Sequence, residues 1–217
     1  MGVMPGAPNF LYTFATFPAD GLAQMAPSFA RLPVDPYIAG AFRRRRFSHF
    51  IGRADALRRL KHTAFYQSQQ VNRYLGGVRR EYEELEDELI ATAAFRALVA
   101  EFHEFLRLDG ATSELGVHQI RIVCTPDLQG DPAPEGVHQD GFDHVGIFCV
   151  ARDNVVGAQT RLYRPKAEAI FARELRPGEA LFVNDREVFH YTDPVRPAVP
   201  GEGHRDVFVF TADRGTA

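Results

Sequence analysis

The sequence lacks a strong charge of either sign, a long apolar run and a set of cysteines large enough to staple a small fold. Lysine and arginine total 25 against 28 aspartate and glutamate residues, so no net field favours nucleic acid or an anionic membrane surface. No stretch reaches the roughly 18 uninterrupted apolar residues of a membrane span. We therefore expect a small-molecule partner, with neither nucleic acid nor a membrane.

The two cysteines, Cys124 and Cys149, both lie within apolar runs. Buried reduced thiols are expected there, because free cysteine behaves as a small buried hydrophobe and disulfides belong to oxidising compartments. The opening segment also lacks the basic stretch that precedes the apolar region of a signal peptide. These features predict a cytoplasmic protein, and 217 residues suffice for one domain with its own core.

The first half of the chain divides into two parts. Residues 1–40 carry scattered proline and glycine without a sustained period, which predicts an irregular arm with one short helix. Such an arm could serve as a lid or a dimer contact, so a homodimer stays open. Residues from about 41 to 110 predict helical support, with helices over 54–72 and 78–108 where apolar side chains recur every three or four positions.

Two charged runs lie in this helical part. Arg43, Arg44, Arg45 and Arg46 are consecutive, and we expect an exposed edge strand whose arginines alternate between solvent and a carboxylate. Acidic residues cluster between positions 81 and 88, where they predict a solvated helix surface near the helix N-terminus.

Short strands dominate the chain from about residue 111 to 215. Alternating or wholly apolar runs cover residues 117–124, 145–150, 180–184, 188–192 and 206–212. Turn signals separate these runs, and no helix-length segment joins most of them. The pattern predicts a fold that is mainly β with helices (α+β), an antiparallel sandwich or barrel with the earlier helices packed outside.

Three side chains form a candidate metal site. His138 and Asp140 stand two residues apart at the expected end of a strand, so alternation points both to one face. His190 follows 190 − 138 = 52 residues later in another short strand. Two imidazoles and one carboxylate make the facial triad of non-haem iron oxygenases, which leaves metal positions open for a bidentate co-substrate and dioxygen. A His-x-Asp pair on its own is a weak signal, and the spacing strengthens it.

Arg205 is the candidate anion-binding residue. It lies 205 − 190 = 15 residues after His190 at the head of the last strand, on the same face as Val207, Val209 and Thr211. A carboxylate would accept its two-pronged donors. A salt bridge to Asp206 or Glu202 is the structural alternative.

Several strings occur in an order and at spacings that match one family. They are Phe65-Tyr66-Gln67-Ser68, Val117-His118-Gln119-Ile120-Arg121, His138-Gln139-Asp140-Gly141, Arg152-Asp153-Asn154-Val155-Val156-Gly157, Arg176-Pro177-Gly178-Glu179 and Arg205-Asp206-Val207. From about Ala41 to Thr211 the chain resembles the bacterial Fe(II)/2-oxoglutarate-dependent dioxygenases that hydroxylate free L-amino acids, the L-isoleucine dioxygenase type.

The resemblance implies a double-stranded β-helix (jelly roll, cupin-like) with N-terminal supporting helices, as a single domain over residues 1–217. It implies His138, Asp140 and His190 as iron ligands and Arg205 as the clamp on the far carboxylate of 2-oxoglutarate. The reaction would use O2, hydroxylate an unactivated carbon of an L-amino acid, and release succinate and CO2. The carboxylate of Asp140 favours hydroxylation over halogenation, because related halogenases leave that position empty for chloride.

The substrate pocket is less determined. Gln119, Arg121 and Thr160 are candidate polar lining residues, and Gln119 and Arg121 share a face if residues 117–123 form a strand. One sequence cannot fix whether that face points inward. The chain departs from the family at Gly157-Ala158, where paired glycines are usual, and in aromatic bulk at Phe208 and Phe210. We expect the pocket to differ at these positions.

Other ionisable residues receive simpler interpretations. Asp143 and His144 are expected at the pocket rim or in solvent, because a fourth protein ligand would close a position that dioxygen needs. The remaining histidines are expected to be hydrogen-bonded or exposed without a role in metal binding: His49, His62, His103, His118 and His204.

Three alternative functions remain open at this point. Similar barrels serve many chemistries, including cupin-like metal isomerases and dioxygenases that need no 2-oxoglutarate. A metal-free binding barrel could also carry the ligand motif by chance. Finally, the same oxidation could act on a carrier-linked or peptide-like biosynthetic intermediate in place of a free amino acid.

Overall fold

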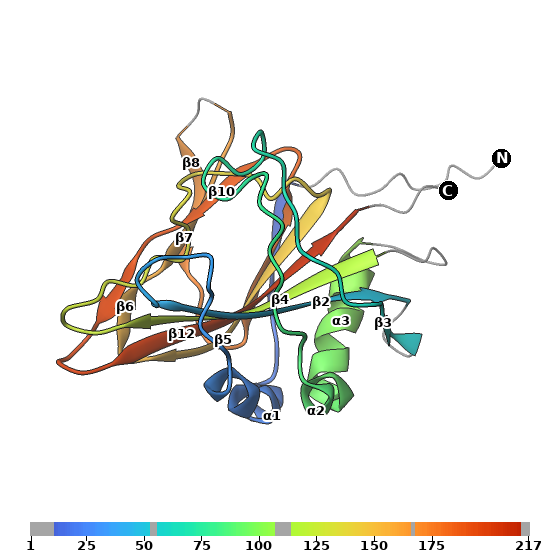
Figure 1. Cartoon of the computed structure of the whole chain (residues 1–217), viewed down its shortest axis with the longest axis horizontal. Helices are drawn as coiled ribbons and strands as arrows, with labels where there is room; N and C mark the ends of the chain where they lie inside the picture. Colours follow the sequence, from blue (N-terminus) through green and yellow to red (C-terminus); the bar gives the residue numbers. More distant parts are fainter. Residues whose placement is uncertain (1–10, 53–55, 107–113, 166–167, 214–217) are drawn as a thin grey trace.

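The computed structural model describes residues 11–52, 56–106, 114–165 and 168–213. Helices and strands follow one another along the chain as Figure 1 labels them. They are β1 (Tyr12–Thr16), α1 (Ala19–Ala30), β2 (Arg43–Ile51), β3 (Arg58–Arg59), α2 (Asp87–Ala91), α3 (Ala93–Leu106), β4 (Glu114–Cys124), β5 (His144–Asp153), β6 (Val155–Gly157), β7 (Gln159–Tyr163), β8 (Ala169–Glu174), β9 (Glu179–Asn184), β10 (Phe189–Thr192), β11 (Val195–Pro197) and β12 (Gly203–Ala212).

One large antiparallel sheet organises the fold. Its seven strands lie in the order β1-β9-β5-β12-β4-β2-β3. A three-stranded sheet, β10-β7-β8, lies on the opposite side of the large sheet from the helices (Figure 1), and β11 pairs with β6. This arrangement of antiparallel strands agrees with the predicted jelly roll, mainly β with a few helices.

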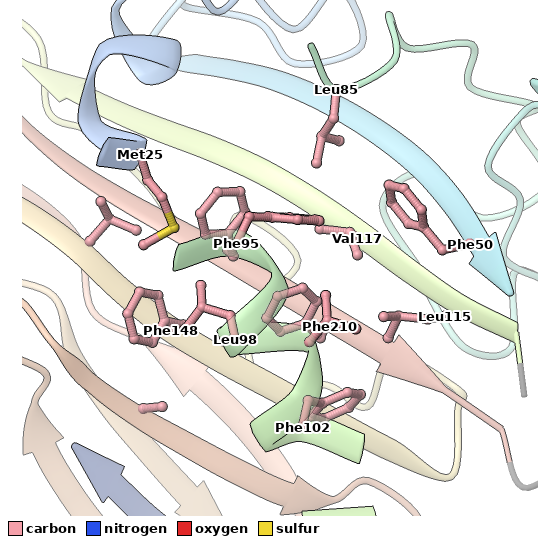
Figure 2. Packing of buried hydrophobic residues seen from close by; sticks show 14 of the residues in the cluster. Met25, Phe50, Leu85, Phe95, Leu98, Phe102, Leu115, Val117, Phe148 and Phe210 are labelled. Carbon is pink, nitrogen blue, oxygen red and sulfur yellow. The ribbon is translucent and has the colours of Figure 1, made fainter. Parts of the chain in front are cut away.

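The helices cover one face of the large sheet. Phe95, Leu98 and Phe102 of α3 are spaced three and four residues apart, so they lie along one side of the helix. They pack on Phe208 and Phe210, which lie on the sheet face that the helices cover, and on Met25 of α1. Figure 2 shows Met25 and Phe210 in this cluster. The aromatic rings meet mostly at tilted or edge-to-face angles, which favours close packing of this cluster.

The opposite face of the sheet points toward β10-β7-β8. Alternation along β5 and β9 directs Ile147, Cys149, Leu181 and Val183 to this side, where they pack against Leu162 of β7. Toward β2, β4 and β12 the same face is lined by polar and charged side chains in addition to apolar ones. The two faces therefore divide into a helix-covered apolar layer and an interior that opens into a cavity.

The prediction of an irregular arm over residues 1–40 was partly wrong for residues 11–40, and residues 1–10 lie outside the described part of the chain. The predicted short helix exists as α1, but Tyr12–Thr16 forms a regular edge strand, β1, paired in register with residues 179–183 of β9. The strand escaped the pattern analysis because five residues show little periodicity, and both of its sides pack on buried clusters, Tyr12 and Phe14 on one and Ala15 on the other.

The helix boundaries in the supporting part also need correction. Only Asp87–Ala91 and Ala93–Leu106 are helical, whereas the described part of 54–86 is extended or forms turns. The segment before α2 lies alongside β2, where the Glu83 carbonyl accepts from the Phe47 N–H and Ser48 Oγ accepts from the Leu85 N–H. These tertiary hydrogen bonds override the helical spacing of Tyr82 and Leu85.

The arginine run is not an exposed edge. It opens β2, which lies between β4 and β3, and Arg43 and Arg45 point inward and are buried. Arg46 does alternate outward, toward Glu83 and Glu86. The prediction that the acidic cluster lies on a helix was wrong in part. Glu81, Glu83, Glu84 and Glu86 precede α2, which begins at Asp87.

The environment of the two cysteines agrees with the sequence analysis. Cys124 and Cys149 are buried free thiols, as predicted, and burial raises the pKa of each. Among the described residues, no helix is long and apolar enough to cross a membrane.

We predict that Phe95→Ala destabilises the protein by about 3–5 kcal/mol, because Phe95 is 0% exposed and its removal leaves a cavity beneath α3. Urea unfolding monitored by circular dichroism measures this loss. Val199→Ala is the control, because Val199 is 63% exposed and truncating it should change the free energy of unfolding by less than about 0.5 kcal/mol. Equal stability of the two variants would contradict the packing described here.

Candidate active site

A cavity lies between the inner face of the large sheet and the loops that cover it. The space open to water centres is about 100 Å³, enough for several water molecules or part of a small organic ligand. Its lining comes from five strands and three loop segments, and its charged members and those with amide or hydroxyl groups include Arg43, Arg45, Gln67, Asn72, Arg80, His118, Glu135, His138, Asp140, His190, Thr192 and Arg205. The concentration of buried ionisable groups in one cavity marks it as the candidate active site.

His138, Asp140 and His190 come together in this cavity. Their ligand atoms all lie within 4.8 Å of one another. Asp140 bridges the two rings, with Oδ1 3.5 Å from His138 Nε2 and Oδ2 3.6 Å from His190 Nε2. A backbone bridge between His138 and His190 brings the two chain segments side by side.

The hydrogen bonds of the two histidines leave their Nε2 atoms available. The His138 Nδ1–H donates to the Gly136 carbonyl at 2.8 Å, so its Nε2 is the nitrogen with a free lone pair when the ring is neutral. His190 is buried, and its Nε2 has no hydrogen-bond partner. Buried polar atoms are rarely left without a partner, so an unmatched imidazole nitrogen beside a carboxylate fits a bound cation.

The electrostatics of the cluster agree with this arrangement. Burial by itself would lower the pKa of His138, but the carboxylates of Asp140 and Glu135 raise it to about 9. Burial would raise the pKa of Asp140, and His190 and His138 instead hold it well below the usual range. A divalent metal would replace those protons as the balancing positive charge.

His138 and Asp140 were predicted at a strand end, and this expectation was wrong. Beyond the single bridge at His138 the segment is a loop, with Gly136 and Gly141 in the left-handed region at φ 81° and 87°. Glycine adopts such angles without the steric cost of a side chain. The two ligand side chains therefore converge from a loop flanked by these glycines, and not from alternation along a strand.

Asp185 holds this loop, and the pattern analysis did not single it out. It is 1% exposed, and its Oδ2 accepts the Gly141 N–H at 2.8 Å. Its carbonyl accepts from the Gln139 side chain, and its Oδ1 lies 3.3 Å from His190 Nε2. Asp185 therefore acts as a positioning residue for both segments of the cluster.

Arg205 lies on the inner face of β12 and lines the cavity with Val207 and Val209, as alternation predicts. It is 2% exposed, and burial lowers its pKa. Its Nε and Nη2 have no hydrogen-bond partner, and no described carboxylate pairs with it. The alternative of a bridge to Asp206 is excluded by the structure, because Asp206 lies on the other face and pairs with Arg121.

Gln119 and Arg121 do not line the cavity, which corrects the expectation for both. They share a face of β4, but it is the helix-covered one. Gln119 donates to Ser28 Oγ of α1, and Arg121 forms a two-pronged pair with Asp206 at 2.7 Å. The cavity receives instead the alternate β4 residues, His118, Ile120 and Ile122.

Thr160 is buried directly behind the lining. Its hydroxyl and that of Thr192, which does line the cavity, are 3.1 Å apart on paired residues of β7 and β10. Thr160 can therefore fix the Thr192 hydroxyl.

Two further expectations about this region need revision, those for His144 and for the aromatic pair Phe208 and Phe210, whereas Asp143 lies outside the cavity lining as expected. Asp143 pairs with the exposed Arg186, but His144 is buried, with its ring edge-on to Phe105. Phe208 and Phe210 pack beneath the helices, so their bulk does not shape the cavity.

Eight of the twelve charged or polar lining residues were not predicted to line the cavity: Arg43, Arg45, Gln67, Asn72, Arg80, His118, Glu135 and Thr192. Alternation puts Arg45 on the same face of β2 as Arg43, and His118 on the same face of β4 as Ile120. The missing information was which face of β2 and β4 is inside, and no pattern within either strand supplies it.

Comparison with known proteins bears on this site. The family model described as 2OG-Fe dioxygenase matches residues 26–211, which include all the cavity-lining residues. This chain belongs to the 2OG-Fe dioxygenase family. The enzyme is thus a 2-oxoglutarate-dependent dioxygenase with Fe(II) as its metal, and the His-Asp-His cluster suits iron, which such enzymes hold by two histidines and one carboxylate.

Solved structures resemble this one over nearly the whole chain. A bsmA homologue from Methylobium petroleophilum PM1 is 28% identical, with a TM-score of 0.81 over 94% of this chain and 89% of its own. IDO from Bacillus thuringiensis is 18% identical, with a TM-score of 0.75 over 94% and 91%. The Fe(II)/α-ketoglutarate-dependent dioxygenase TqaL is 20% identical, with a TM-score of 0.71 over 95% and 83%. The last two similarities concern the fold. No curated protein matches the sequence.

We predict that Asp185→Asn weakens Fe(II) binding roughly 10- to 100-fold, because the neutral amide supports the Gly141 loop and His190 less well. Anaerobic metal titration measures the affinity. Asp193→Asn is the matched control, since Asp193 pairs with Arg161 outside the cavity and should retain the affinity of the unmodified protein. Unchanged affinity in Asp185→Asn would remove Asp185 from its positioning role.

Proposed function

We propose that this dioxygenase hydroxylates an unactivated carbon of a free L-amino acid, with His138, Asp140 and His190 as the iron ligands and Arg205 as the clamp on 2-oxoglutarate. One observation carries the assignment of residues. The three-residue cluster and an arginine without a carboxylate partner line the same cavity, and both are left with unmatched polar atoms. A metal and a dicarboxylate together satisfy those atoms.

Arg205 suits the distal carboxylate of 2-oxoglutarate by charge and by shape. A guanidinium presents parallel N–H groups that match two carboxylate oxygens, and burial strengthens such a pair. Val207 and Val209 continue the same face of β12 into the cavity, so apolar contacts are available for the methylene carbons of the co-substrate.

When bound, iron and 2-oxoglutarate supply the oxidation with O2, and succinate and CO2 are released. The residues of the chain contribute position, since the carbon nearest the metal is the one that reacts. Asp140 holds the position that a halogenase needs for chloride, which supports hydroxylation as the outcome.

The lining also supports an amino acid as substrate. Besides Arg205 the cavity carries two further buried cations without a carboxylate partner, Arg45 and Arg80, and one carboxylate beyond Asp140, that of Glu135. Groups of both signs in a small cavity suit a zwitterion, whose ammonium and carboxylate each need a partner when they leave water.

The direct test is succinate formation by the iron-loaded enzyme given 2-oxoglutarate, O2 and each of the twenty L-amino acids in turn. We expect one or a few to stimulate succinate several-fold over the substrate-free rate. His190→Ala is the inactive control and should lose stoichiometric iron, whereas His204→Ala should keep it. Bound iron without stimulation by any amino acid would argue for a carrier-linked or peptide-like substrate instead.

We predict that Arg205→Gln raises the KM for 2-oxoglutarate roughly 100-fold or more, as expected when one member of a buried charge pair is removed. Arg161→Gln is the control, because Arg161 pairs with Asp193 away from the cavity. Steady-state kinetics with varied 2-oxoglutarate separate the two variants. An unchanged KM in Arg205→Gln would mean that another residue binds the co-substrate.

A further inference from the structure

A second pair of cations lies in the cavity, apart from Arg205. Arg45 of β2 is 7% exposed and Arg80 is 2% exposed, and both line the cavity. Neither forms an ion pair with a carboxylate of the described residues. Buried arginines are normally paired, because removing an uncompensated charge from water is costly.

The groups around these arginines hold them without neutralising them. Arg45 Nη2 donates to His118 Nδ1 at 2.7 Å, and its guanidinium lies 4.6 Å from the centre of the Tyr82 ring. Arg80 Nη2 donates to Gln67 Oε1 at 2.8 Å and lies 4.7 Å from the centre of the Phe65 ring. The Nε of each arginine has no partner. Both guanidiniums are thus fixed in place with donors to spare.

His118 adds no negative charge. Burial lowers its pKa well below the ordinary value, and Arg45 and Arg80 lower it further, so the ring is neutral. Because an arginine only donates, His118 Nδ1 accepts and the ring proton sits on Nε2. Burial also lowers the pKa of Arg45 to about 10, with opposing smaller effects from Tyr82 and Asp35, which raise it, and from Arg43 and Arg80, which lower it.

Arg43 shows how this fold treats a buried arginine that needs no ligand. It lies on the same face of β2, two residues before Arg45, and its Nε donates to the buried Asp35 at 2.8 Å. Arg45 and Arg80 have no such carboxylate. The contrast within one strand indicates that their anion comes from outside the protein.

The pair lies near the metal cluster but away from Arg205. Gln67 connects Arg80 to the ligand loop, since its Nε2 donates to the Asp140 carbonyl at 2.9 Å. Arg45 faces Ile120 across β2 and β4, whereas Arg205 faces Ile122 from the other side of β4. Two strand spacings separate their backbones by about 10 Å, so the two sites suit two different carboxylates.

We propose that Arg45 and Arg80 bind the carboxylate of the substrate, so that the substrate class is small molecules with a free carboxylate. This inference rests on the proposed function and deepens it. A thioester-linked amino acid or an internal peptide residue has no free α-carboxylate, so this site would distinguish a free amino acid from both. Phe65, which both guanidiniums approach, and His118 complete the wall behind the carboxylate.

The test compares an L-amino acid that supports turnover with its carboxamide, which keeps the shape and loses the charge. We expect the unmodified enzyme to prefer the acid roughly 100-fold in kcat/KM. Arg45→Gln and Arg80→Gln should each raise the KM for the acid by a similar factor and largely abolish the preference, while the KM for 2-oxoglutarate changes less than about 3-fold. Arg45→Lys, which keeps the charge, should recover part of the loss.

Arg46→Gln is the matched control. Arg46 is the next residue on β2, points outward to Glu83 and Glu86, and should leave both KM values unchanged. Equal use of acid and amide by the unmodified enzyme would overturn the inference. So would an unchanged KM for the acid in both glutamine variants, or a rise confined to the KM for 2-oxoglutarate.

A binding measurement separates this inference from the proposed function. Anaerobic protein saturated with iron and 2-oxoglutarate is titrated calorimetrically with isobutyrate and with isobutyramide. If no amino acid is turned over but isobutyrate binds in preference, and Arg45→Gln removes that preference, the carboxylate site stands while the amino-acid proposal fails. If neither probe binds, or both bind equally, the carboxylate site is wrong whatever the substrate proves to be.

Discussion

The pairing of β12 with β4 on one side and β5 on the other is the constraint on which the rest depends. Ten residues of β12 pair with β4, and alternation along them sends Arg205, Val207 and Val209 to the cavity and Asp206 and Phe208 to the helix face. A slip of one residue would exchange these sets. The anion site, the apolar cavity wall and the helix-packing surface would all be lost together.

The charge of the interior follows from the same alternation. Four arginines line the cavity, and only Arg43 has a carboxylate partner within the described chain. Two lining carboxylates offset the positive charge of the other three arginines. They are Glu135 and Asp140, and Asp140 binds the metal in the proposed function. The interior is thus short of negative charge until anionic ligands enter, so the free enzyme carries an electrostatic cost that ligand binding removes. Ligand affinity and protein stability are coupled in this way.

The sequence predicted most where chemistry and periodicity coincide. The late strands, the jelly-roll class and Arg205 on the inner face could be inferred, because alternation within one strand fixes which residues share a side. Alternation could not show which side of a strand faces the interior. Gln119 and Arg121 were therefore assigned to the cavity, although it is His118, on the opposite side of β4, that lines it. Asp185 was missed because its role depends on a loop, around Gly141, that is distant in sequence.

The helical prediction for the described part of 54–86 failed for a related physical reason. Spacing at three and four residues is compatible with a helix, but Tyr82 and Leu85 reach the core from an extended segment that follows β2. Backbone hydrogen bonds to a distant strand are not visible in a local pattern. Arg80 lies in this same segment, where a backbone bridge pairs it with Phe65, and it lines the cavity. Its place in the cavity was not predicted for the same reason.

The central place of β12 also has a consequence for how the chain folds during synthesis. β12 is the last of the described strands to leave the ribosome, yet it is the strand that joins β4 to β5. After β5 is complete at Asp153, 202 − 153 = 49 further residues must be translated before β12 begins at Gly203. Until then the two halves of the large sheet cannot pair, and their apolar faces stay uncovered. The active-site cavity, which β12 lines, is therefore among the last features of the protein to form during synthesis.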